Sequence, residues 1–204
     1  QLAQAVGFPQ SKLSKIELGL QAVSAEDLAS IADALDFDAE LFRQCGPVHA
    51  LGASLLYRQR ARVTVAVQRR VEAEFNLRKL QISRLLRGVS LESNHIFPSI
   101  PTEETNGNVE EVARRVREAW RVPNGPIKDL TAVVEDAGAI VIQADFGTNL
   151  IDGAHLWVPT LPPVFFMNSQ VSGERFRFSL AHEVGHAVMH RAAIQGEIES
   201  EANR

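Results

Sequence analysis

Residues 182–186 read His-Glu-Val-Gly-His, and this short stretch predicts both a helix and a chemistry. Around it, apolar residues recur at steps of four: Phe176, Leu180, Val184 and Val188. Such spacing is typical of an amphipathic helix, in which positions four apart share a face. His182 and His186 therefore lie on one face, where two imidazoles can bind one zinc ion. Gly185 weakens the helix, but it would let another backbone approach.

Glu183 is the candidate catalytic residue. Zinc lowers the pKa of a bound water from about 15.7 to about 7, and a neighbouring carboxylate can then act as general base. A catalytic zinc needs a third protein ligand and one open position. Three glutamates near the end of the chain could supply that ligand: Glu197, Glu199 and Glu201. The alternative interpretation is a surface helix that carries two histidines by chance.

Glu199 is the predicted third ligand. In one class of zinc peptidases this ligand comes from a second helix that reads Glu-x-x-[Ala/Ser]-[Asp/Asn], whose last residue hydrogen-bonds a ligand histidine. Only Glu199 has Ala202 and Asn203 at these distances, so Asn203 is the expected orienting residue and Glu201 the alternative ligand. His190 continues the four-residue series but lies a further turn along the axis, so we interpret it as a flanking residue.

Together these residues resemble the ImmA/IrrE family of zinc metallopeptidases. The similarity covers roughly residues 108–204, and its most specific parts are residues 173–190 and 199–203, preceded by Asp145-Phe-Gly147, Ile151-Asp-Gly153 and residues 162–168. The resemblance implies a gluzincin-like zinc endopeptidase that cleaves a helix-turn-helix repressor in a stress or mobile-element response. It also implies that 108–204 is a domain cut short at its C-terminal end, because the family pattern continues past Asn203.

Residues 1–45 predict an Xre-type helix-turn-helix domain whose first helix is missing. Gly7 and Gly19 each follow a short helical pattern, as glycines at helix C-terminal ends do. The helix between them should bury Leu13 and Ile16 and present its polar residues to base edges and phosphates of an operator. These DNA-binding candidates are Gln10, Ser11, Lys12, Ser14 and Lys15.

The third helix of this domain should begin at Ser24, which with Asp27 forms a variant capping box. Its expected core residues, with two that close the bundle, are Leu28, Ile31, Ala32, Leu35, Leu41 and Phe42. Residues 1–45 carry three Lys/Arg and seven Asp/Glu, whereas DNA-binding modules are usually basic. A small bundle that docks proteins is therefore the alternative, although the acids cluster beyond the recognition helix.

Residues 46–95 are expected to form a helical connector, and residues 96–107 a linker. Residues 46–90 hold nine Lys/Arg against two Glu, a net charge of +7. Two apolar series with helical spacing run through this region: Val63, Val67, Val71 and Phe75, then Ile82, Leu85, Leu86 and Val89. We expect the connector to be a homodimer arm, whose arginines could add phosphate contacts. A solvated basic face over a contact between helices is the alternative.

Short strands are expected at residues 139–142, 153–158 and 164–167, after two helices that begin at Asn108 and Ile127 and before the zinc helix. The fold class is therefore α+β and mostly helical, with an N-terminal helix-turn-helix bundle, a helical connector and a gluzincin-like metallopeptidase domain with a small sheet. No apolar run reaches the length of a membrane span. The single cysteine, Cys45, fits a reducing compartment.

These observations predict a cytoplasmic DNA-binding regulator, associated with the nucleoid when bound to DNA, that carries a Zn²⁺-dependent endopeptidase. The expected partners are operator DNA, a protein substrate such as a repressor, and a second copy of the chain. No oxyanion stabiliser stands out, with His155, His190 or an arginine as weak candidates. The competing hypothesis is a regulator whose metallo-domain senses a metal or ligand and cleaves nothing.

Overall fold

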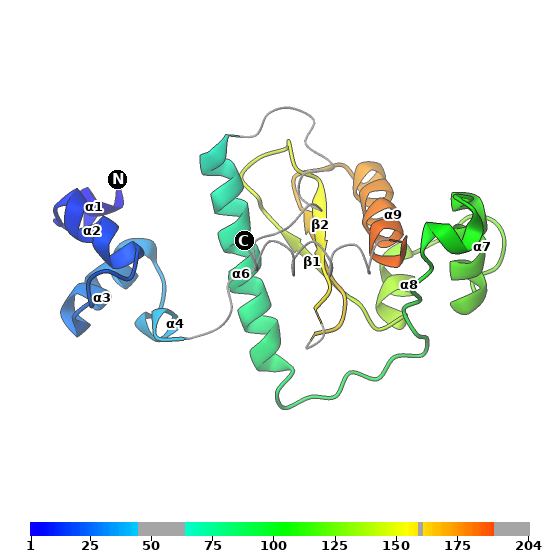
Figure 1. Cartoon of the computed structure of the whole chain (residues 1–204), viewed down its shortest axis with the longest axis horizontal. Helices are drawn as coiled ribbons and strands as arrows, with labels where there is room; N and C mark the ends of the chain where they lie inside the picture. Colours follow the sequence, from blue (N-terminus) through cyan, green and yellow to red (C-terminus); the bar gives the residue numbers. More distant parts are fainter. Residues whose placement is uncertain (45–63, 159–160, 190–204) are drawn as a thin grey trace. The chain divides into compact units, whose positions relative to one another are not determined.

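The computed structural model describes residues 1–44, 64–158 and 161–189, and it divides the chain into two compact units, Gln1–Pro47 and Val48–Arg204. Within the described residues, no helix is both long enough and apolar enough to cross a membrane. Each unit is described by itself, because their relative placement is not determined (Figure 1).

The N-terminal unit consists of short helices: α1 Leu2–Ala5, α2 Gln10–Glu17, α3 Ala25–Leu35 and α4 Ala39–Phe42. Gly7 and Gly19 adopt left-handed φ angles of 68° and 69°, which confirms the predicted helix ends, since glycine takes this conformation without strain. Ser24 caps α3 by accepting a hydrogen bond from the Asp27 amide. The core comprises Ala3, Leu13 and Ile31, against which Leu2, Val6 and Phe8 pack.

Two expected core positions of this unit are exposed. Leu35 and Phe42 keep more than a third of their surface open, contrary to the expectation that they close the bundle. Leu35 is the last residue of α3, where Asp36 turns into the left-handed region, and the ring of Phe42 meets another exposed ring, Phe37, edge to face. The side chains of Leu35 and Phe42 therefore lie outside the small core.

The C-terminal unit is built on three strands, as predicted: β1 Ile140–Ala144, β2 Gly153–Leu156 and β3 Val164–Asn168. Their order is β1-β3-β2, with β3 parallel to β1 and antiparallel to β2. Side chains alternate between the two faces of a strand. On the central strand, Val164 and Phe166 therefore enter one core and Phe165 and Met167 the other.

Helix α6, Val65–Leu85, covers one face of this sheet (Figure 1). Val71 and Phe75 are fully buried, and the Phe75 ring lies 4.2 Å from the Phe166 ring, centroid to centroid. The sequence predicts that this apolar series belongs to a separate connector that forms a dimer contact. Val67, Val71 and Phe75 instead pack within the unit, because the sheet offers an apolar face that would otherwise meet water.

The segment expected as a linker also contributes to the core. Phe97 and Ile100 are buried, and the Phe97 ring lies 5.2 Å from the Trp120 ring and 5.9 Å from the Phe165 ring, between centroids. Thr102–Thr105 forms a 3₁₀ helix, η1. The prolines and polar residues of 96–107 predict a linker. Phe97 and Ile100 nevertheless pack into the core and hold this segment against the C-terminal unit.

Three further helices complete the unit: α7 Val109–Ala119, α8 Leu130–Asp136 and α9 Gly173–Met189. Asn108 caps α7 as predicted. Helix α8 begins three residues later than Ile127, since Asp129 caps it, and Gly138 follows its end with a φ of 85°. Helix α9 covers the sheet face opposite α6 (Figure 1), so the sheet lies between two helical layers.

Candidate metal centre

Polar side chains anchor the first half of α9 to the loop before β2. Arg175 donates a hydrogen bond from Nε to Oδ2 of the buried Asp152, at 2.8 Å, and Ser179 Oγ lies 3.2 Å from the same oxygen. Hydrogen bonding to Asp152 raises the pKa of the Arg175 guanidinium. Asn168 donates to the carbonyl oxygens of Thr148 and Ile151, at 2.6 and 2.7 Å. Asn168 thus holds the loop, and Arg175 and Ser179 tie α9 to it.

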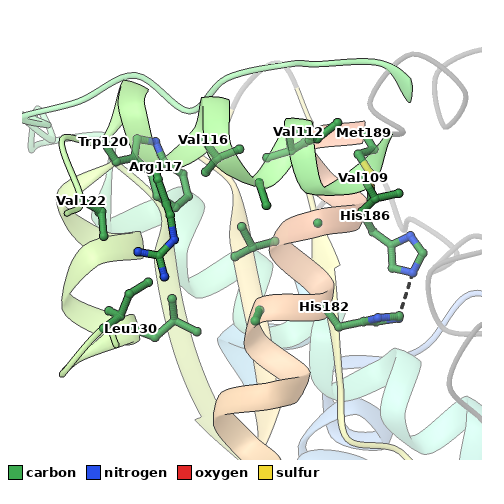
Figure 2. Close-up of a pocket in the computed structure, with 16 residues that line it drawn as sticks. Val109, Val112, Val116, Arg117, Trp120, Val122, Leu130, His182, His186 and Met189 are labelled. Atoms are coloured by element: carbon green, nitrogen blue, oxygen red, sulfur yellow. Dashed lines mark hydrogen bonds between the residues drawn. The ribbon is translucent and has the colours of Figure 1, made fainter. Parts of the chain in front are cut away.

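His182 and His186 lie one turn apart on α9 and converge (Figure 2). Their Nε2 atoms are 3.0 Å apart, and their rings meet edge to face at 4.4 Å between centroids. A tetrahedral zinc with bonds of about 2.0–2.1 Å to nitrogen separates two such atoms by about 3.3 Å. The two imidazoles therefore fit a shared zinc ion after a shift of a few tenths of an ångström.

Glu183 turns toward the sheet, away from the solvent. It is 1% exposed, and its Oε2 lies 2.9 Å from Nδ1 of His155, which is 4% exposed. His155 comes from β2, the edge strand that packs on α9. It pairs in register with Phe165, whose side chain enters the core beneath α9. The edge strand and the helix thus bring an imidazole and a carboxylate together.

The structure does not assemble a complete ligand set among the residues it describes. No cluster of three His, Cys, Asp or Glu side chains suited to a metal occurs in residues 1–44, 64–158 and 161–189. The predicted third ligand Glu199 and the orienting residue Asn203 lie outside those ranges, as do Glu197, Glu201 and His190. Glu199 and Asn203 therefore remain predictions.

A cavity of about 350 Å³ lies beside the two histidines (Figure 2). Its walls are α7, the start of α8 and the second half of α9, with apolar side chains that include Val112, Val116, Leu130 and Met189. Arg117 also borders it, but its guanidinium donates hydrogen bonds to the Pro123 and Gly125 carbonyl oxygens. The cavity therefore suits an apolar group next to the paired imidazoles.

Gly185 also borders this cavity, and its environment corrects one expectation. A Cβ atom built there would meet only the Met189 Cε, at 3.5 Å, which is ordinary contact. No backbone from another described element approaches it. The glycine is thus not required by close packing within the described part of the unit.

The candidate DNA-binding residues lie on α2 as predicted, but they differ in exposure. Gln10, Ser11 and Lys15 are exposed, whereas Ser14 is half-buried. Lys12 is half-buried as well: its Nζ lies 2.8 Å from Asp27 Oδ1 and 4.1 Å from the centroid of the Phe8 ring. The hydrogen bond from Lys12 lowers the pKa of the Asp27 carboxyl. Lys12 therefore also ties α2 to α3 within the unit.

Comparison with known protein families finds one known domain toward each end of the chain. Residues 1–44 match the model of a helix-turn-helix domain, and residues 134–204 match the model of the IrrE N-terminal-like domain, a metallopeptidase family. The chain thus carries a helix-turn-helix domain of a DNA-binding type at its N-terminus and a metallopeptidase-like domain at its C-terminus. No curated protein and no solved structure matched the chain.

Proposed function

We propose that this protein is a DNA-binding transcriptional regulator whose C-terminal domain is a zinc-dependent endopeptidase. The observation that carries the proposal is the convergence of the His182 and His186 Nε2 atoms, 3.0 Å apart, with Glu183 between them in the sequence. The family matches at both ends of the chain support it.

His182, His186 and Glu199 would hold the zinc ion, and Asn203 would orient one of the ligands. When bound, zinc would supply Lewis-acid activation of the peptide carbonyl and of a water. Glu183 would accept a proton from the attacking water and pass it to the leaving amine as the peptide bond breaks. The anchoring of α9 by Arg175 and Asp152 would keep this carboxylate in place.

The substrate would be a protein, for which we favour a helix-turn-helix repressor in a stress or mobile-element response. The backbone of β2 forms an edge of the described sheet, and an edge strand can pair with an extended peptide. The apolar cavity beside His182 and His186 would then receive an apolar side chain of that peptide. Among the described residues its lining contains no Asp, Glu or Lys, and the Arg117 guanidinium already donates to the Pro123 and Gly125 carbonyl oxygens.

The N-terminal unit would bind operator DNA in the cytoplasm through the exposed residues of α2, with Gln10 reading base edges and Lys15 near the phosphates. We also propose a homodimer, since operators usually match a two-fold protein. Leu85 is a better candidate for the contact than Val71 or Phe75, because it is 73% exposed. Light scattering of the parent and of Leu85→Asp would test this.

The experiment that tests the enzymatic proposal compares the zinc-loaded parent with His182→Ala. The parent should bind one zinc ion per chain and cleave a candidate repressor, and the variant should lose both properties, because the remaining ligands cannot form a stable site. Elemental analysis and mass spectrometry of the repressor measure the two effects. Unchanged zinc in the variant would exclude this site.

A non-proteolytic regulator that senses a metal or ligand is the second candidate. The burial of Glu183 against His155 favours it, because a general base must reach a water. In such a protein, Glu183→Gln would leave regulation of a reporter unchanged, and no cleaved repressor would be found in cells that carry the parent.

A further inference from the structure

The pair formed by Glu183 and His155 extends the proposed function beyond the zinc ligands. We propose that His155 is a positioning residue for Glu183: its Nδ1–H holds carboxylate oxygen Oε2, so that Oε1 is left to accept the proton from the attacking water. The inference rests on the proposed peptidase function, but the contact itself can be tested without any activity.

The chemistry of the two groups fixes the direction of their hydrogen bond. An ionised carboxylate only accepts hydrogen bonds, whereas a neutral imidazole donates from one nitrogen. A general base must be ionised, so in the proposed role of Glu183 the 2.9 Å contact between His155 Nδ1 and Glu183 Oε2 has the proton on Nδ1. Both side chains are buried, so little water competes for the contact.

Rigid elements hold both partners. His155 lies on β2, paired with β3, and Glu183 lies on α9, which packs on both strands. The hydrogen bonds of Arg175 and Ser179 to Asp152 tie the same helix to the residue just before β2. A histidine on a rigid strand can therefore restrict the rotamers of a glutamate on a rigid helix.

The other nitrogen of His155 argues against a purely structural role. Nε2 is buried and has no hydrogen-bond partner among the described residues. An unsatisfied buried polar atom destabilises the folded state, and an apolar side chain on β2 would avoid this cost. Only the contact of Nδ1 with Glu183 offsets it in the described part of the unit.

The test uses the 204-residue chain with its histidines labelled with ¹⁵N, and it reads the imidazole nitrogens of His155 by NMR. We expect a protonated Nδ1 whose proton is shifted downfield by the hydrogen bond, with or without added zinc. Glu183→Gln should move this signal, whereas the exposed Glu174→Gln on the same helix should not. An unprotonated Nδ1, or a signal unaffected by Glu183→Gln, would overturn the proposal.

A second measurement asks whether the contact serves catalysis, with casein as the probe. His155→Leu should lower kcat by about 10–100-fold, the usual effect of losing such an outer partner, while KM and bound zinc stay within about threefold. His155→Asn keeps a donor near the Nδ1 position and should restore most of the rate. Thr105→Val, which removes a buried hydroxyl elsewhere, is the control for lost stability.

The outcomes separate this inference from the proposed function. Equal kcat values for the parent and a folded His155→Leu would overturn the positioning role, as would a His155→Asn variant that folds but is no better than His155→Leu. If the zinc-loaded parent cleaves neither casein nor a repressor, the peptidase proposal fails. The NMR signature then still decides whether His155 holds Glu183.

Discussion

The rings of Phe75 on α6 and Phe166 on β3 lie 4.2 Å apart, between centroids, and this contact joins the helix that follows residue 63 to the sheet that supports the candidate site. A second ring, Phe146, lies 5.5 Å from Phe75. The compact C-terminal unit therefore includes α6.

Phe75→Ala should test the importance of this contact. Removing a fully buried phenylalanine usually costs about 3–5 kcal/mol of unfolding free energy, because a cavity remains. Denaturant unfolding of the parent and the variant measures the loss. Val65→Ala, at an exposed position on the same helix, should change the free energy by no more than about 0.5 kcal/mol. Equal losses in the two variants would contradict the assignment of α6 to this unit.

Two glycines should respond in opposite ways to alanine. Gly185 is helical and has room for a Cβ, so Gly185→Ala should raise the unfolding free energy by up to about 1 kcal/mol. Gly147 has a φ of 65°, and a Cβ there would lie 2.7 Å from the Arg70 guanidinium, so Gly147→Ala should destabilise. Thermal unfolding measures both changes. A lower melting temperature for Gly185→Ala would contradict the finding that a Cβ atom fits beside this glycine.

Several features of this fold were predictable because they are local. Asn108 and Gly138 mark helix boundaries through their own backbone and side-chain preferences, and apolar runs marked the three strands. The partner of α6 was not predictable, since periodicity shows which face of a helix is apolar and not what covers it. The contact between His155 and Glu183 was missed for a similar reason: it depends on the sheet register and on the packing of α9, which local spacing does not encode.

Acid should weaken α7 through Glu111. Hydrogen bonds from Arg114 and then Arg115 lower the pKa of this carboxyl from 4.5 to about 2. Because the folded-state pKa lies below the unfolded value, the stabilising effect is present above about pH 4.5 and is lost as the pH falls toward 2. Glu111→Gln should therefore make stability less dependent on pH in this window, as followed by thermal unfolding at several pH values. If the stability of the parent and of Glu111→Gln depended equally on pH, the ion pairs of Glu111 with Arg114 and Arg115 would be contradicted.

The exposed residues of α2 should decide DNA affinity. Gln10→Ala is expected to weaken binding to the cognate operator by about 1–3 kcal/mol where the side chain contacts a base. Lys15→Ala should weaken binding to all sequences and reduce its salt dependence. Fluorescence anisotropy at several salt concentrations measures both effects, with the exposed Ser30→Ala on α3 as control. Parent protein that shows no salt-sensitive DNA binding would favour a protein-docking role for this unit.

The most direct test of the account is the cleavage of a candidate repressor by the zinc-loaded parent and by Glu183→Gln, followed by mass spectrometry. The variant keeps the zinc ligands but loses the carboxylate that accepts the proton, so the rate should fall by about 10²–10⁴-fold while the zinc content is unchanged. The exposed Glu174→Gln on the same helix should cleave like the parent. Equal cleavage rates for Glu183→Gln and the parent would contradict the role of Glu183 as the general base.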